Sequence, residues 1–316
     1  MSPTRNCFAG CLAILLLITT ADVISAQLLR FPRPSQKASV MQIIGVTEVS
    51  LVYSRPGVKG RRIWGDPTAA QKAVGTATLD DQRARPQDAA IVPYGHVWRS
   101  GANEATQFIV SDDVVINGQP LKAGTYSLHT IPGRDEWTIV INSDAGQWGS
   151  FSYDEKKDVL RVKAKPETVA DNQEWLAYSI DPVTDNTAQV NIRWEKIRVP
   201  FTVEVKDVNA TALNRTRAIV TAAKPDDWRT PLQAANYFLN NSAKADDAEA
   251  IAWLEQSIKV KETFGNLFAK ARLLAGQGKT EEAVTTGERA LQLGKEAKAD
   301  TSDLERRLNE WKSKKT

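Results

Sequence analysis

The spacing of apolar residues changes near Val205, and this change limits the possible folds more than any other feature of the chain. Before Val205, short segments alternate polar and apolar residues, as residues 189–194 do, and this alternation predicts strands with one buried face. After Val205 the pattern changes to the longer period of helices. We therefore expect a mainly β fold, an antiparallel sandwich or barrel, followed by a small α-helical region.

Turn signals separate the strands that we expect in residues 27–205. Asn117-Gly118 is a strong hairpin signal, and Pro132-Gly133 also turns the chain. Residues 56–90 are rich in Gly, Pro, Lys and Arg and have little periodicity, so we expect a long surface loop with fragments of helix there. The expected strands are 46–53, 107–110, 114–116, 125–131, 136–142, 159–163, 174–180, 188–194 and 197–205.

The C-terminal part, residues 228–316, contains an internal repeat. Residues 248–258 align with residues 281–291, and the alignment places Ala250 on Ala283. The offset, 281 − 248 = 33 residues, is close to the ~34-residue period of tetratricopeptide repeats, and the tail resembles two degenerate repeats of that family. An unrelated pair of helical hairpins is the alternative. Residues 206–227 are polar and are expected to link the two halves, and the expected helices are 231–241, 246–259, 266–275, 280–294 and 302–311.

The N-terminal residues 1–26 have the layout of a secretory signal peptide. One cation, Arg5, precedes an apolar run over residues 8–18, and small residues follow up to Ala26. The apolar run is shorter than the ~20 residues that a spanning helix needs, although an uncleaved anchor is the alternative. We therefore expect an exported protein, periplasmic or extracellular, whose mature chain begins at Gln27 and spans no membrane.

Composition excludes several functions for the mature chain. Both cysteines, Cys7 and Cys11, lie in the predicted signal, so disulfides, thiol nucleophiles and thiolate metal sites are not expected after cleavage. The net charge is +3, and removing the signal takes away Arg5 and Asp22, which leaves it at +3. The basic residues are scattered, so no nucleic-acid partner is expected. Phosphate loops, dinucleotide fingerprints and serine-hydrolase elbows do not occur, and no cofactor is expected.

Three ordered stretches of the β region resemble a known family of exported bacterial proteins. They are residues 52–61 with Ile63-Trp64-Gly65, residues 92–106, and residues 121–128. They are similar to the family named domain of unknown function 2911, and the resemblance extends over about residues 39–205. It implies no established activity and no catalytic residue, and the helical tail lies outside it.

One segment, residues 94–106, concentrates side chains that could carry chemistry. It lies on a turn-rich stretch between predicted strands, where binding sites tend to be built. Arg99 could hold a carboxylate or phosphate, Trp98 and Trp64 could stack on a sugar or base, and Glu104 could act as a general acid or base. The structural alternative is that Trp98 lies in the core while Arg99 pairs with Glu104. The candidate ligand-binding residues are Trp64, Tyr94, Trp98, Arg99, Asn103 and Glu104, with Glu104 and His96 as candidate catalytic residues.

The histidines His96 and His129 raise the question of a metal site. His129 is predicted on a strand with Ser127 and Ile131 on the same face, and a two-histidine site would need Glu104 or an aspartate beside them. Nothing in the spacing requires this, so no metal is expected.

These observations favour a non-catalytic exported binding protein. Its β domain would hold a small polar ligand or glycan at the surface of Trp64, Trp98 and Arg99, and its helical repeats would dock a protein partner. One alternative is a hydrolase that uses Glu104 with an aspartate or histidine partner. The other is a structural component of the cell envelope without a small-molecule site.

Overall fold

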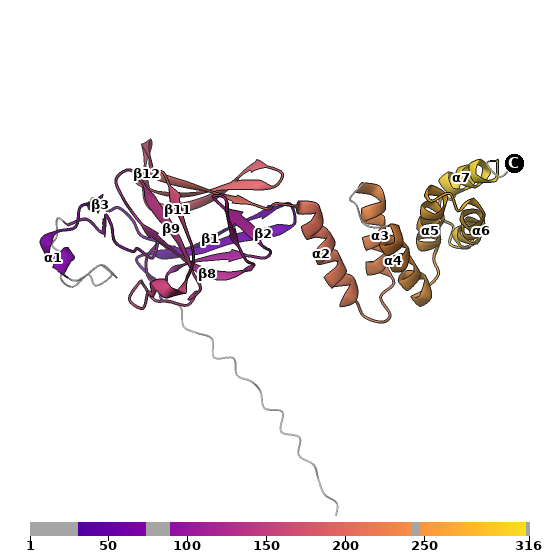
Figure 1. Ribbon diagram of the computed structural model, residues 1–316, viewed down its shortest axis with the longest axis horizontal. Coiled ribbons are helices and arrows are strands. Elements are labelled where there is room, and N and C mark those ends of the chain that lie inside the picture. Colours follow the sequence, from indigo (N-terminus) through magenta and orange to yellow (C-terminus); the bar gives the residue numbers. More distant parts are fainter. Residues whose placement is uncertain (1–30, 74–88, 242–246, 314–316) are drawn as a thin grey trace, which may run out of the picture. The chain divides into compact units, whose positions relative to one another are not determined.

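Figure 1 shows a computed structural model of the chain, in which residues 31–73, 89–241 and 247–313 are described. The predicted signal peptide, residues 1–26, lies outside the described residues, as do residues 74–88 of the predicted loop. The described residues from Ser35 onward form one compact unit. Within the described ranges, no helix is long and apolar enough to cross a membrane.

Two antiparallel sheets form the β domain, as the alternation predicts (Figure 1). They do not close into a barrel, so the sandwich is the architecture that forms. The six-stranded sheet consists, in spatial order, of β1 (Gln36–Ile44), β2 (Thr47–Arg55), β5 (Thr106–Val110), β8 (Gly124–Ile131), β9 (Trp137–Asn142) and β10 (Asp158–Ala164). The four-stranded sheet consists of β11 (Glu167–Thr184), β12 (Thr187–Glu204), β6 (Val114–Ile116) and β7 (Gln119–Leu121).

The core of the β domain lies between the two sheets. In β12 the buried residues Val190, Ile192 and Trp194 alternate with residues that face outward, which is the pattern predicted for this segment. Phe108 of β5 meets Phe201 of β12 edge to face, with ring centroids 6.3 Å apart. Both phenyl rings are almost fully buried, so side chains from both sheets make one shared apolar layer.

The predicted hairpin at Asn117-Gly118 is confirmed, since these residues join β6 to β7. Their φ angles are 44° and 85°, and two consecutive positive values are what a tight type I′ turn requires. The Asn117 side chain also holds the turn against the rest of the domain. Its Oδ1 accepts a hydrogen bond from the Thr202 amide at 2.7 Å, and its Nδ2 donates to the Lys163 carbonyl at 2.8 Å.

The segment 56–90 is less of a surface loop than its composition predicts. It contains helix α1 (Ala69–Ala73) and strand β3 (Trp64–Gly65), which pairs in parallel with β4 (Val92–Pro93). Ile63 is buried in the core, and Gly57 forms a bridge with Trp175 of β11. In the described part of this segment, single apolar residues rather than a repeating face attach the chain to the domain, which explains the lack of periodicity there.

The polar segment 206–227, which is expected to link the two halves, contains a helix that the sequence analysis does not predict, α2 (Val208–Thr221). Asp207 caps it, since its carboxylate accepts a hydrogen bond from the Ala210 amide at 2.8 Å. Val208 packs on the core of the β domain, and Arg215 forms an ion pair with Asp112 at 3.3 Å. The helix has few buried residues, which explains why its apolar pattern is weak. The five predicted helices are also present: α3 (Arg229–Asn241), α4 (Asp247–Val260), α5 (Phe264–Gly276), α6 (Thr280–Glu296) and α7 (Ser302–Ser313).

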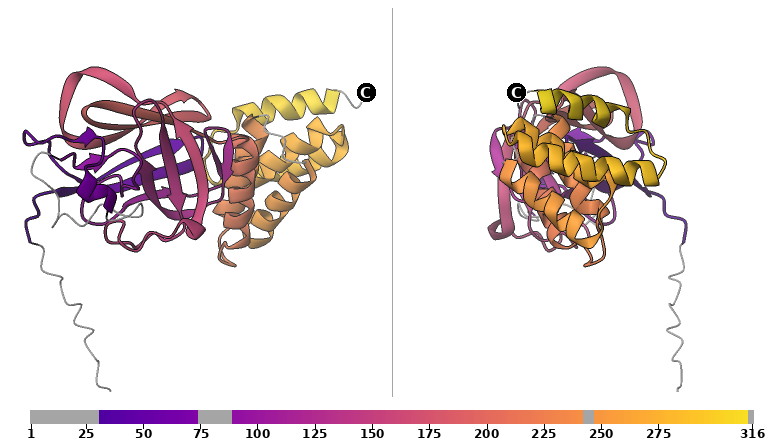
Figure 2. Two further views of the ribbon diagram at one scale, coloured as in Figure 1. Left: turned by 60° about the vertical axis from the view of Figure 1, so that its left-hand side comes forward. Right: turned by 90° about the vertical axis from the view of Figure 1, so that its right-hand side faces the viewer.

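Helices α3 to α7 pack each against the next one along the chain (Figure 2). The repeat places small residues where helices approach closely, and Ala250 of α4 and Ala283 of α6 are both buried. At Gly287 of α6, an added Cβ would lie 2.9 Å from Leu308 of α7, closer than van der Waals contact allows. Gly287 therefore allows α6 and α7 to approach each other closely.

Candidate functional site

Trp98 is a core residue, so its predicted role in an exposed stacking surface is wrong. It is 6% exposed and stacks on Trp194 with centroids 5.7 Å apart. Trp64 is partly buried and meets Trp98, Trp137 and Trp194 edge to face at 5.6, 5.0 and 5.6 Å. The Trp98 indole donates a hydrogen bond to the Gly101 carbonyl at 3.1 Å. The structural alternative therefore holds for Trp98, which forms a four-tryptophan cluster with Trp64, Trp137 and Trp194 inside the sandwich.

Tyr94 and His96 lie outside the cavity that Glu104 lines. The Arg134 guanidinium lies over the Tyr94 ring, 5.4 Å from its centroid, in a cation–π arrangement. His96 is 7% exposed, and desolvation by burial lowers the pKa of its imidazole. Neither residue lines the cavity beside Glu104 that is described below. The two candidate catalytic residues therefore do not share a site.

The backbone between Trp98 and Thr106 is strained at two positions. Ser100 and Asn103 have φ angles of 56° and 60°, a region that residues other than glycine rarely adopt. The Ser100 carbonyl accepts hydrogen bonds from the hydroxyls of Tyr178 at 2.7 Å and Thr106 at 2.9 Å. Asn103 donates through Nδ2 to the Ser35 carbonyl at 3.1 Å. This network holds a conformation that the chain would otherwise leave, and such strain clusters at functional sites.

Two exposed aromatic residues gather beside Arg99 and Glu104. Residues 103–105 pair with residues 147–149: the Ala105 amide donates to the Gln147 carbonyl at 3.0 Å, and the Gly149 amide donates to the Asn103 carbonyl at 2.9 Å. Glu104 is therefore directly opposite Trp148, and side chains of opposed residues in an antiparallel pair share a face. Trp148 and Phe151 are 54% and 52% exposed. We call Arg99, Glu104, Trp148 and Phe151 the Trp148 surface.

Gly149 makes the Trp148 surface possible. Its φ is 66°, and a Cβ there would lie 2.8 Å from Nη1 of Arg99 and 2.9 Å from the Phe151 ring. Only glycine allows the guanidinium and the phenyl ring to approach the backbone so closely. The same Nη1 donates a hydrogen bond to the Asn103 carbonyl at 3.2 Å. The sequence analysis missed Trp148 and Phe151, although two aromatic residues around one glycine between strands are a visible signal.

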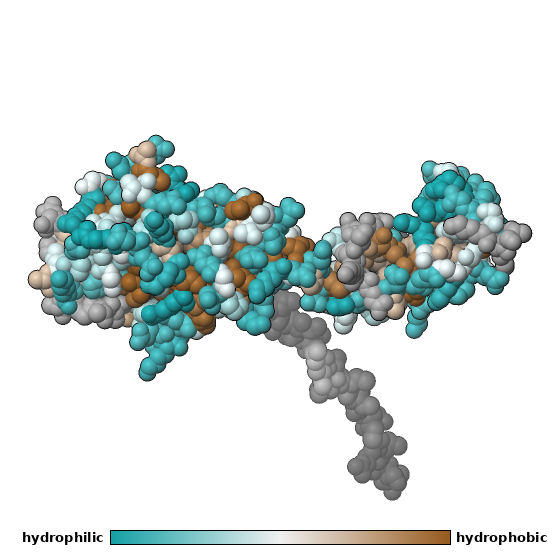
Figure 3. All heavy atoms as spheres, turned by 45° about the horizontal axis from the view of Figure 1, so that its top comes forward, coloured by the Kyte–Doolittle hydropathy of each residue, from teal (hydrophilic) through white to brown (hydrophobic). Residues whose placement is uncertain are grey.

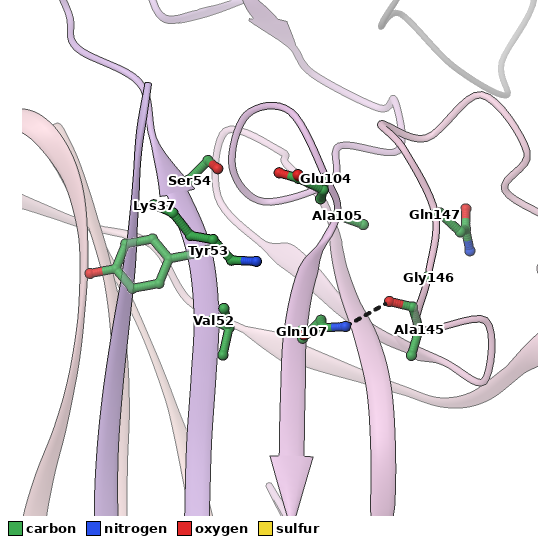
Figure 4. A pocket seen from close by; sticks show the side chains of 10 residues that line it. All are labelled: Lys37, Val52, Tyr53, Ser54, Glu104, Ala105, Gln107, Ala145, Gly146 and Gln147. Carbon is green, nitrogen blue, oxygen red and sulfur yellow. Dashed lines mark hydrogen bonds between the residues drawn. The ribbon is translucent and has the colours of Figure 1, made fainter. Parts of the chain in front are cut away.

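A cavity of about 130 Å³ adjoins Glu104 (Figure 4). Figure 4 shows the Lys37 side chain extending over β2 toward β5, with the Glu104 carboxylate at the rim of the same space. Gln107 closes one side by donating to the Ala145 carbonyl at 3.2 Å. Gln147 is 5% exposed, and its Oε1 has no hydrogen-bond partner within the described ranges. The lining residues are Lys37, Val52, Tyr53, Ser54, Glu104, Ala105, Gln107, Ala145, Gly146 and Gln147.

His129 lies in a separate polar cluster on the outer face of the six-stranded sheet. Segment 143–157, which includes the 3-10 helix η2 (Glu155–Lys157), covers it. Its Nε2 lies 3.2 Å from the Ser127 hydroxyl, its Nδ1 lies 3.4 Å from the Ser150 hydroxyl, and its ring centroid is 5.1 Å from that of Tyr153. The imidazole is fully buried, and desolvation lowers its pKa to about 4. A neutral imidazole is therefore part of the packing of this face at pH 7.

The chemistry available at the cavity is binding by hydrogen bonds and charge. Among its lining residues in the described part of the chain, Glu104 is the single carboxylate and there is no histidine, whereas acid–base hydrolysis needs two such groups. Residues 31–73, 89–241 and 247–313 contain no cluster of three or more His, Cys, Asp or Glu that could hold a metal ion. Figure 3 shows hydrophilic residues over much of the surface, with apolar residues in patches among them over the β domain.

Comparison with known proteins identifies one family. Residues 35–203, more than half of the chain, match the family described as Protein of unknown function (DUF2911). This confirms the resemblance that the three ordered stretches indicate. The helical region lies outside the match, so its likeness to tetratricopeptide repeats stays a prediction. No curated protein and no solved structure matches the chain.

Proposed function

We propose that this chain, which belongs to the DUF2911 family of proteins of unknown function, is an exported, non-catalytic binding protein for a small polar ligand of the sugar class. The ligand would lie on the Trp148 surface and place one substituent in the cavity beside Glu104. The observation that carries this proposal is the pairing of Glu104 with the exposed Trp148.

The aromatic residues support a ligand with an apolar face. A single exposed aromatic side chain is common on protein surfaces and needs no explanation. Two of them beside a strained loop form a surface on which a ring can stack. A sugar ring has C–H groups on one face and hydroxyls at its edge, so the hydroxyls would meet Arg99 and Glu104 while the C–H face meets Trp148. The planar guanidinium of Arg99 would also fix the orientation of the ligand through directed hydrogen bonds.

The cavity supports a small substituent rather than a whole ligand. Its volume of about 130 Å³ corresponds to roughly four water molecules. A hydroxymethyl, amino or acetamido group fits this space. Lys37 and Gln147 supply a donor and an acceptor there, since the Gln147 Oε1 is buried without a partner among the described residues. Buried polar atoms of this kind gain most when a ligand satisfies them.

Export and partner docking belong to the same proposal. The layout of residues 1–26 supports secretion, which would expose the binding surface to the periplasm or to the outside. The helical region supports docking of a protein partner, because stacked antiparallel helix pairs leave a groove lined by one helix of each pair. The β domain would then recognise a ligand while the tail connects it to a second protein.

Thermal unfolding with a panel of saccharides tests the binding site. The panel contains neutral hexoses, amino sugars, acetamido sugars and their short oligomers, and the variants are Trp148→Ala and Trp175→Ala. Trp175 is a matched control because it is a partly exposed tryptophan of the β domain that lies beside Lys59 and outside the site. We expect at least one saccharide to stabilise the wild type and the Trp175→Ala variant.

At a saccharide concentration near the wild-type Kd, the Trp148→Ala variant should lose most of this stabilisation. Loss of one stacking contact weakens binding by about fivefold. A Glu104→Gln variant should weaken binding of amino sugars more than of neutral hexoses, because it removes the charge and keeps the shape. The proposal fails if no saccharide stabilises the wild type, or if Trp148→Ala responds as Trp175→Ala does.

A further inference from the structure

A second cavity lies between the β6–β7 hairpin and the start of helix α2. Its volume is about 410 Å³, which is within the usual range of small-molecule sites. Val115 and Leu121 of the hairpin form its floor and are 5% and 4% exposed. Pro120 and Ala210 form its sides. The cavity is independent of the Trp148 surface, since the two share no lining residue.

We call this second cavity the groove. Its two walls, the β6–β7 hairpin and the start of helix α2, are each fixed by contacts. The hairpin is fixed by the Asn117 hydrogen bonds described above. Helix α2 is fixed to the β domain because Val208 packs on the core and Arg215 pairs with Asp112. A preformed groove with an apolar floor binds an apolar ligand without the entropy cost of ordering its own walls.

Two carboxylates and two ammonium groups line the groove, and they differ in their partners. Asp113 is paired with Lys122 at 2.7 Å and also accepts the Ala123 amide at 2.9 Å. Asp207 is engaged by the first turn of α2, through its hydrogen bond from the Ala210 amide. Lys206 is exposed and makes no ion pair with the described residues. Asp113 is therefore paired with Lys122, and Asp207 is stabilised by the positive N-terminal end of α2, so Lys206 is the rim cation with which an anionic head group can pair.

We propose that this groove, lined by the β6–β7 hairpin and the first turns of α2, binds a single-chain amphiphile with an anionic head group, such as a fatty acid. The alkyl chain lies on Val115, Pro120, Leu121 and Ala210, and the head group lies at Lys206. A volume of about 410 Å³ accommodates an alkyl chain of roughly ten carbons.

Isothermal titration calorimetry with three ten-carbon probes below their micelle concentrations tests this site. The probes are decanoate, decanol and decyltrimethylammonium, titrated into the full mature chain. Ala210→Trp fills the groove, and Lys206→Gln removes its charge. Ala218→Trp is the matched control, because Ala218 is exposed on the same helix and does not line the groove.

We expect saturable decanoate binding with a negative heat-capacity change, as burial of an alkyl chain requires. Ala210→Trp should weaken it at least tenfold, and Ala218→Trp should leave it unchanged. Lys206→Gln should weaken decanoate binding by about two- to fivefold, as expected for one exposed ion pair, and decanol binding by less. Absence of saturable decanoate binding, equal or tighter binding of the cationic probe, or unchanged binding by Ala210→Trp would each overturn the proposal.

Discussion

Acid should destabilise the β domain through His129. This imidazole is neutral at pH 7 because burial lowers its pKa to about 4, from about 6.5 in the unfolded chain. Asp158 and Asp144 oppose the shift, Arg99 adds to it, and the ring of Tyr153 packs beside the imidazole. Burial outweighs the two carboxylates because no charged partner makes a hydrogen bond to either ring nitrogen in the described structure.

The sign and the size follow from proton linkage. Between pH 6.5 and pH 4 the unfolded chain binds a proton that the folded chain does not bind, so the free energy of unfolding decreases as the pH falls. The contribution of this group is fully present above pH 6.5 and is lost progressively down to pH 4. It amounts to about 2 kcal/mol between pH 7.5 and pH 5, and to roughly 3 kcal/mol at pH 4.

Urea unfolding of the wild type and His129→Gln at pH 7.5 and pH 5 measures this effect. Glutamine keeps hydrogen-bonding groups near Ser127 and Ser150 but does not titrate, so the difference between the two pH dependences isolates His129. His96 titrates in the same direction in both proteins and cancels. We expect the wild type to lose about 2 kcal/mol more than the variant. Equal losses in the two proteins would refute the assignment of His129 as a buried neutral base.

Three further predictions concern the N-terminus, the core and the tail. Protein recovered from the cell envelope should have the intact mass of a chain that begins at Gln27, and a mass that retains residues 1–26 would contradict export with cleavage. Trp98→Ala should reduce the free energy of unfolding by roughly 3 to 5 kcal/mol in urea, whereas a loss below about 1 kcal/mol would remove Trp98 from the core. Gly287→Val should clash with Leu308 and lower the melting temperature of the helices, at a cost of about 1 to 3 kcal/mol in the free energy of unfolding. Gly276→Val is the control, because a Cβ at Gly276 meets open space and the variant therefore measures the cost of valine in a helix alone. Equal melting temperatures for these two variants would contradict close packing of α6 on α7.

The sequence predicts the regular elements of this chain well because their local signals agree with their burial. The strands of the β domain alternate, the Asn117-Gly118 turn has the φ angles that its residues favour, and the helices of the tail carry a consistent apolar face. Helix α2 is not predicted because its local apolar pattern is weak. Its buried residues are few, Ala212 and Val220, and Val208 and Leu213 pack on two different cores, so periodicity gives little signal.

The candidate site is predicted only in part. A high density of polar and aromatic residues in a sequence segment does not show in which direction each side chain points. The segment 94–106 does contain Arg99 and Glu104, which belong to the Trp148 surface. Trp98 points inward, to a position that depends on contacts with Trp137 and Trp194 far along the chain. Trp148 and Phe151 lie in a segment without strand or helix pattern, and only the pairing of residues 103–105 with 147–149 brings them to Glu104.

The indole N–H signals of the nine tryptophans provide the most direct test of ligand binding at the Trp148 surface. Each tryptophan gives one such signal in a ¹H–¹⁵N spectrum. The signal that is missing from the spectrum of the Trp148→Ala variant is that of Trp148. Titration with the saccharide that stabilises the protein most should move the Trp148 signal with saturation and leave those of the buried Trp98, Trp137 and Trp194 in place. A titration in which the Trp148 signal stays fixed while that of another tryptophan moves would contradict the account.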